Sequence, residues 1–98
     1  MGKEQKRELT HYKNGQKTFE QKGDILTYYF NTGAIRAKGP SPQGRMQGKW
    51  IFYRKSGQLW GIGHFKDDKK HGLWLRYDKN GKEEYRESFN EGKQVKKK

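Results

Sequence analysis

The side chains with the potential for chemistry are few and form no recognisable catalytic or metal-binding pattern. His64 and His71 lie seven residues apart in two segments that we expect to be separate strands, and no repeated acidic partner accompanies them. The sequence has no cysteine, which rules out thiolate ligands, disulfides and thiol catalysis. Gly61 and Gly63 match the start of a dinucleotide-binding loop, but its third glycine and the helix after it are missing. We therefore expect a protein that is not an enzyme, binds no metal and needs no cofactor.

Positive charge is the second chemical feature. The chain has 23 Lys and Arg against 11 Asp and Glu, a formal net charge of +12, and residues 24–57 carry six basic side chains but one acidic one. Basic groups beside aromatic rings suit acidic proteins, nucleic acids or anionic lipids, although charge on a thin sheet also serves solubility alone. The six basic candidates for a binding surface are Arg36, Lys38, Arg45, Lys49, Arg54 and Lys55.

The overall composition is close to that of disordered chains, with 29% hydrophobic and 35% charged residues. The 14% of aromatic residues points the other way, because disordered chains are usually poor in aromatics. The longest apolar run, residues 50–53, is far shorter than the roughly 18 residues of a spanning helix. We expect one small folded domain. Its expected location is cytoplasmic, but only by default, because an export signal that had been removed would leave no trace.

The elements that position these residues follow an internal repeat of 24 residues. The scaffold residues that align at this offset are Leu26, Tyr29, Gly33, Gly48, Trp50, Tyr53, Gly57, Gly72, Trp74, Tyr77 and Gly81. The expected organisation is a repeat domain at residues 9–92, with a basic arm at 1–8 before it and a disordered lysine tail at 93–98 after it. Its units are about 9–23, 24–47, 48–71 and 72–92, and the first of them is compressed.

The sequence of each unit predicts a β-hairpin. Residues 26–30 and 50–53 are rich in aromatic and β-branched side chains, and pairs such as Asn80-Gly81 supply the turn. The predicted fold is all-β, a single elongated antiparallel meander of about four hairpins. Alternation places Trp50 and Phe52 on the same face. One sheet cannot bury both of its faces, so one face should be partly exposed or covered by a partner.

Two segments fit the hairpin pattern less well. Pro40 and Pro42 lie where a return strand is expected, so we predict that this strand stops near Lys38 and that a loop runs to Gly44. Residues 83–91 also have helical spacing, but their register with the preceding unit favours a strand.

Trp60 is the candidate exposed aromatic residue. Its equivalents in the neighbouring units are Arg36 and Glu84, so no packing rule calls for a tryptophan there. Trp50 and Trp74, in contrast, recur in register and are better explained as scaffold. We expect Trp60 to join the six basic residues in the binding surface.

The pattern Gly-x-Trp-x-x-Tyr-x-x-x-Gly-x-Leu, which residues 48–59 match in full, resembles the MORN repeat. More closely, it resembles the bacterial variant of this repeat found in the YwqK-like antitoxin family. The copy that begins at Gly72 departs at Glu83, where an aliphatic residue is expected, and the resemblance covers about residues 9–92. It implies an elongated antiparallel sheet that binds proteins or phospholipids and does not catalyse a reaction.

Three functional hypotheses follow. The first is a protein-interaction module with an acidic protein partner, of an antitoxin or immunity type. The second is a peripheral binder of anionic phospholipid or nucleic acid through the basic surface. The third is a structural spacer that oligomerises through its sheet edges, although we favour a monomer. None of the three requires a small-molecule substrate.

Overall fold

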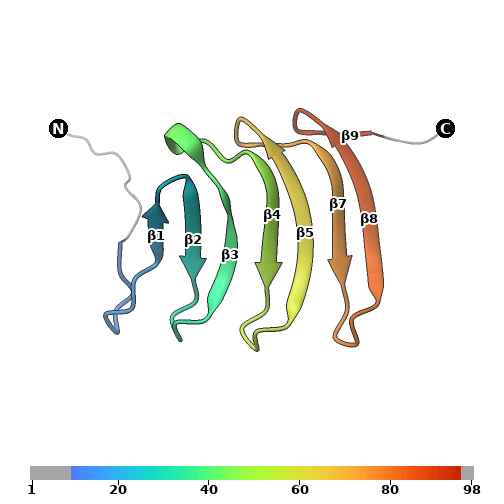
Figure 1. Cartoon of the computed structure of the whole chain (residues 1–98). Helices are drawn as coiled ribbons and strands as arrows, with labels where there is room; N and C mark the ends of the chain where they lie inside the picture. Colours follow the sequence, from blue (N-terminus) through green and yellow to red (C-terminus); the bar gives the residue numbers. More distant parts are fainter. Residues whose placement is uncertain (1–9, 96–98) are drawn as a thin grey trace.

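The structure, a computed structural model, describes residues 10–95, which form one layer of antiparallel strands (Figure 1). The strands are β1 (Phe19–Lys22), β2 (Ile25–Tyr29), β3 (Ile35–Pro40), β4 (Gly48–Tyr53), β5 (Leu59–Lys66), β6 (Lys69–Lys70), β7 (Gly72–Tyr77), β8 (Glu83–Asn90) and β9 (Lys93–Val95). They lie in the order β1-β2-β3-β4-β5-β7-β8-β9, and the short β6 pairs with β5. One 3-10 turn, η1 (Pro42–Gly44), links β3 to β4. The predicted all-β meander is confirmed.

Four hairpin turns repeat the same hydrogen bonds. They begin at Tyr12, Phe30, Arg54 and Asp78, so that the last three follow one another at the repeat spacing and the first lies closer to the second. In each turn the first residue donates its N–H to the carbonyl four residues on, at 2.8 Å, and accepts a bond from the turn glycine at 2.8–3.0 Å. The three later turns all lie at one end of the sheet, the lower end in Figure 1. The compressed first copy therefore keeps the turn of the others.

Each of the three long hairpins contains a β-bulge at the same repeat position. In the central hairpin Phe52 pairs with Gly61 and Tyr53 pairs with Leu59, which leaves Trp60 without a partner in the ladder. Arg36 and Glu84 are skipped in the same way in the other two hairpins. A bulge re-aims a side chain and increases the local twist. Trp60 occupies the bulge, so its side chain does not follow the alternation that orients its neighbours on the strand.

The two junctions that link the three long hairpins are paired much less than these hairpins themselves. β3 and β4 share two residue pairs, as do β5 and β7, whereas the β4–β5 ladder has six. At the first junction the indole N–H of Trp50 donates to the Pro40 carbonyl at 2.9 Å, and at the second Trp74 donates to the His64 carbonyl at 2.9 Å. Each tryptophan therefore supplies a hydrogen bond where the backbone ladder is interrupted.

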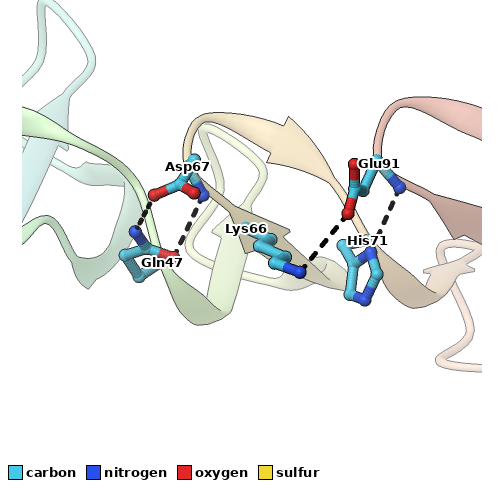
Figure 2. A network of polar contacts seen from close by, with 5 residues as sticks. All are labelled: Gln47, Lys66, Asp67, His71 and Glu91. Carbon is cyan, nitrogen blue, oxygen red and sulfur yellow. Dashed lines mark hydrogen bonds and ion pairs between the residues drawn. The ribbon is translucent and has the colours of Figure 1, made fainter.

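The loops at the opposite end of the sheet are joined by a second repeated contact (Figure 2). The backbone N–H of Asp67 donates to Oε1 of Gln47 at 3.0 Å, and one repeat later the N–H of Glu91 donates to Nδ1 of His71 at 3.1 Å. Glu91 also pairs with Lys66, with 3.3 Å between Oε2 and Nζ. These bonds hold each loop against the loop that follows it.

Two details of the predicted organisation were wrong. β3 continues to Pro40, two residues beyond the predicted end at Lys38, because Pro40 pairs with Ile25 at the end of the ladder and the interior N–H groups are unaffected. Lys93–Val95, assigned to a disordered tail, instead form β9, which pairs with β8 from Ser88 to Asn90. The predicted arm at 1–8 and the tail residues 96–98 lie outside the described residues. The strand prediction for residues 83–91 is confirmed by β8.

The buried core is small, as the composition predicts. Among the described residues the buried hydrophobic side chains are Leu26, Ala37 and Trp50, and the exposed fraction of Trp50 is 0%. Phe19, Tyr28, Met46, Phe52 and Phe65 pack against these three and are partly buried. A sheet without a second layer thus concentrates its packing on one face.

Candidate binding groove

One face of the sheet, which we call the aromatic face, carries a continuous row of rings. The neighbouring ring centroids in this row are 5.2–6.5 Å apart. Its members are Phe19, Tyr28, Trp50, Phe52, Phe65, Trp74 and Phe89. Contacts at these distances are favourable beyond simple burial. The row runs from β1 to β8, so the hairpins share a single packed surface.

A groove of about 630 Å³, which we call the main groove, lies on the aromatic face across β2 to β5. Its lining residues are Tyr28, Phe30, Arg36, Ala37, Met46, Trp50, Phe52, Tyr53, Arg54 and Trp60. Its volume lies within the usual range for ligand sites, which are mostly apolar with a few polar groups. Eight of the ten lining residues are apolar or aromatic, and the other two are arginines. The groove therefore suits a ligand that is largely apolar but also has a negatively charged group.

A smaller hollow of about 130 Å³, the side hollow, adjoins the main groove and shares Phe52 and Trp60 with it. The other residues that line it are Gly61, Lys70, Trp74, Leu75, Arg76 and Tyr85. Among the described residues no carboxylate lines either the main groove or the side hollow, although four cations line the two together.

The cations on this face lie against aromatic rings. The guanidinium of Arg36 is 5.6 Å from the ring centroid of Tyr28. Lys70 Nζ is 4.7 Å from the centroids of both Trp74 and Phe89. Such contacts orient a cation without neutralising its charge. The cations therefore stay available to an anionic ligand.

Arg54 differs from the other cations of the groove because the backbone engages it. Its Nη2 donates to the carbonyl of Tyr77 at 3.0 Å, across the turn of the next hairpin. Its Nε is buried and has no hydrogen-bond partner in the part of the chain that the structure describes. Arg54 thus joins two turns while its charge remains at the end of the main groove.

The structure separates the six basic residues proposed from the sequence. Arg36 and Arg54 line the main groove together with Trp60, whose exposed fraction is 38%. Lys38 lies on the opposite face in a second hollow, and alternation from Trp50 places Lys49 on that face too. The other two lie at the ends of the sheet. Lys55 is in a hairpin turn, and Arg45 pairs with Asp67 of an outer loop at 3.6 Å.

The opposite face has a different character. The hollow around Lys38, of about 320 Å³, is lined by Ile25 and Ile35, which are exposed, and by Glu20 and Tyr29. The Tyr29 hydroxyl donates to Oε1 of Glu20 at 2.8 Å. This bond, together with the charges of nearby lysines, lowers the pKa of Glu20. The same bond, with burial and the charge of Glu20, raises the pKa of Tyr29. This hollow contains an acidic group and is smaller than the main groove.

Sequence reasoning missed Arg76 and Lys70. A signal for Arg76 was present, because it stands in the repeat column that holds Tyr28 and Phe52, where a charged residue is out of place. Lys70 gives no comparable signal, since it follows Lys69 in a loop-like segment and reaches the aromatic face only through the short strand β6.

Comparisons with known proteins support the repeat assignment. Residues 46–67 and residues 70–91 each match the MORN repeat variant, and the two segments cover the hairpins β4–β5 and β7–β8. No curated protein and no solved structure shows significant similarity to the chain. The two matched hairpins thus have the sequence of a repeat that in general forms interaction modules.

Two further findings concern the described residues. None of the helical segments within residues 10–95 has the length and apolar character needed to cross a membrane. The same residues contain no group of three or more His, Cys, Asp or Glu side chains placed to hold a metal ion. His64 and His71 instead take part in hydrogen bonds of the scaffold, to the Leu73 carbonyl and the Glu91 N–H.

Proposed function

We propose that this protein is a non-enzymatic interaction module whose main groove binds an apolar segment of an acidic protein. The observation that carries the proposal is the composition of the groove, which has an aromatic and aliphatic floor, two arginines and no carboxylate among its described lining residues. The apolar floor supplies burial for hydrophobic side chains, and the arginines select segments with negative charge.

A protein segment fits this surface better than a nucleic acid. Bases bind by stacking on open ring faces. On this face Arg36 lies over Tyr28, and Lys70 lies over Trp74, so cations already occupy faces of these rings. Trp50 is fully buried. The accessible features are apolar side chains and cationic edges, which match the side chains of an acidic amphipathic peptide.

A flat anionic membrane is also a poorer match. Lipid binding draws on basic residues that face the membrane together. Lys38 lies on the face opposite to Arg36, and Arg45 is paired with Asp67 at one end of the sheet. A recess on one face of the sheet instead favours a chain that inserts side chains into it.

Self-association through the groove is opposed by charge. Each copy has a formal net charge of +12, so two copies repel one another before they meet. An acidic partner gains from the same charge, because electrostatic attraction steers the encounter. An antitoxin or immunity-type role is a special case of this proposal, in which the acidic segment belongs to a toxin.

A selection from a library of random dodecapeptides tests the proposal. We expect the wild-type protein to enrich peptides that combine Asp or Glu with at least one large apolar side chain. The groove variant is Arg36→Gln with Trp60→Ala, and its matched control is Lys38→Gln with Lys49→Gln, which removes more charge but from the opposite face. The selected peptides should lose affinity for the groove variant and keep most of it for the control.

Other results would contradict the proposal. Peptides that bind both variants alike, or that lack acidic residues, would show that the main groove is not the binding surface. The same two variants, titrated with a single-stranded oligothymidine and with phosphatidylserine vesicles, test the alternatives. Tight binding of either probe that only the groove variant loses would overturn the proposal in favour of nucleic acid or lipid.

A further inference from the structure

The two residues that depart most clearly from the repeat pattern on the aromatic face contact each other. Trp60 stands at a bulge position that holds Arg36 and Glu84 in the other units, and Arg76 stands in a column of aromatic residues. The guanidinium of Arg76 lies 5.1 Å from the ring centroid of Trp60. Departures from a structural pattern tend to mark functional positions. This pair therefore calls for an explanation beyond packing.

The backbone around Arg76 makes room for this contact. Arg76 pairs with Gly61 on one side and with Tyr85 on the other. Gly61 has no side chain, and a Cβ atom there would lie 2.7 Å from the carbonyl oxygen of Leu75. The side chain that reaches Arg76 from β5 is consequently the bulged Trp60. On the other side the Arg76 guanidinium lies 4.6 Å from the ring centroid of Tyr85.

Two aromatic rings thus contact the Arg76 guanidinium without neutralising it. Within residues 10–95 it makes neither a hydrogen bond nor an ion pair. Ring contacts restrict the orientation of a guanidinium while its N–H groups stay available at the edge. Lys70 lines the same side hollow and adds a second positive charge. The hollow therefore combines positive charge with guanidinium donors that are unused within the described residues.

We propose that the side hollow is a subsite for one carboxylate side chain, an Asp or Glu of the segment bound in the main groove. The Arg76 guanidinium donates two N–H groups to the carboxylate oxygens, and Lys70 contributes charge. Trp60, which lines both the main groove and the side hollow, separates the apolar part of the segment from its acidic part. The subsite depends on the proposed function in one respect only, namely that the carboxylate belongs to a protein segment bound in the main groove.

The geometry favours a carboxylate because a guanidinium edge binds its two oxygens in one plane. It also predicts that arginine and lysine are not equivalent at position 76. Arg76→Lys keeps the charge but removes the fork of donors, so its affinity for an acidic ligand should fall between those of the wild type and Arg76→Gln. A purely electrostatic role would instead leave Arg76→Lys equal to the wild type.

The first experiment uses a dodecapeptide selected on the wild-type protein and its single Glu→Gln and Asp→Asn variants. Arg76→Gln should weaken the parent peptide by about tenfold or more, the usual loss for a hydrogen bond to a charged group. Against one amide variant of the peptide the same substitution should have almost no effect. The control, Lys49→Gln, removes a charge from the other face and should lower all affinities equally and slightly. If Arg76→Gln weakens every peptide variant by the same factor, the subsite does not exist.

The second experiment does not depend on a bound segment. The N-acetyl α-amides of glutamate and glutamine, of which only the glutamate derivative has a carboxylate, are titrated at equal ionic strength while the indole N–H resonance of Trp60 is followed by NMR. We expect a saturable shift with the glutamate derivative alone, and its loss in Arg76→Gln. Equal responses to both compounds, or none to either, would overturn the subsite. If no peptide is selected but the glutamate shift appears, the subsite stands and the proposed function fails.

Discussion

Trp50 lies directly on the backbone of Gly39, so closely that a Cβ atom added to Gly39 would be 2.4 Å from the indole Cγ. The same relationship recurs one repeat later, where a Cβ at Gly63 would be 2.5 Å from the ring of Trp74. Real side chains do not approach this closely, so each glycine is required by the ring that covers it. The two glycines are thus part of the scaffold even though neither recurs through all the units.

Gly63→Ala is therefore expected to destabilise the protein, by about 1–3 kcal/mol, as overpacking usually does. The direction is informative, because alanine in place of glycine normally improves a strand. Urea denaturation of Gly63→Ala in the wild-type and Trp74→Leu backgrounds measures the effect. The loss should shrink when the indole is absent. An equal loss in both backgrounds would mean that the ring is not its cause.

Trp50 and Trp74 should contribute unequally to the free energy of unfolding. Trp50 is fully buried, so Trp50→Ala should cost about 3–5 kcal/mol, whereas Trp74 is half-buried and Trp74→Ala should fall at or below the lower end of that range. Trp74→Phe keeps much of the ring contact but removes the hydrogen bond to His64, so it should cost about 1 kcal/mol more than burial alone predicts. Unchanged thermal stability of Trp74→Ala would show that this column is a surface feature.

Trp60, in contrast, should contribute more to peptide binding than to stability. Because it is 38% exposed and lies outside the strand ladder, Trp60→Ala should change the free energy of unfolding by less than about 1 kcal/mol. The same variant should lose affinity for peptides selected on the wild type. Stability is measured by thermal denaturation and affinity by fluorescence polarisation of labelled peptide. A large loss of stability with intact binding would make Trp60 a scaffold residue.

The contact between Tyr29 and Glu20 predicts how stability depends on pH. The bond from Tyr29 and the charges of Lys17 and Lys22 lower the pKa of Glu20 in the folded protein. A lowered folded pKa stabilises the protein above the unfolded value, about 4.3 for Glu, and this contribution disappears as the pH falls through the folded pKa. Glu20→Gln should therefore flatten the acid side of a plot of melting temperature against pH.

Tyr29→Phe provides the control for this contact. The pKa of Tyr29 is raised, chiefly by its bond to Glu20, so its contribution is present below the unfolded value of about 10 and is lost as the pH rises through the folded pKa. Tyr29→Phe should thus flatten both sides of the plot, whereas Glu83→Gln, which removes a pair with Arg86, should affect the acid side alone. Acid limbs of equal slope in Glu20→Gln and the wild type would contradict the assignment.

The fold was predictable because residues typical of turns and strands recur every 24 positions. Turn glycines and strand aromatics recur in register, and each recurrence limits where a strand can begin and end. β9 was missed because Lys93 and Gln94 carry no apolar pattern, and they become a strand by pairing with β8. Pro40 was taken as a strand breaker, but at the end of a ladder its missing N–H is not needed.

The candidate site was only half predictable, for a geometric reason. The bulge removes one residue from the ladder, so Arg36 reaches the main groove while Lys38 lies on the opposite face. Counting along the sequence cannot locate such a bulge, and the basic residues therefore looked like one surface. The exposure of Trp60 followed from its place outside the repeat pattern. Applied to Arg76, the same reasoning would have identified the second residue of that pair.

The sparse pairing between hairpins has a mechanical consequence. The main groove spans the junction of β3 and β4, where the ladder has two residue pairs and the Trp50 indole is hydrogen-bonded to Pro40. The neighbouring hairpins are therefore joined at this junction mainly by side chains, with Trp50 of β4 packed against Leu26 and Ala37 of the preceding hairpin. A small rotation at this junction would change the width of the groove while the six-pair β4–β5 ladder stayed intact. Under the proposed function, such a rotation would let the groove adjust to the bound segment while the strands of this small domain stayed paired.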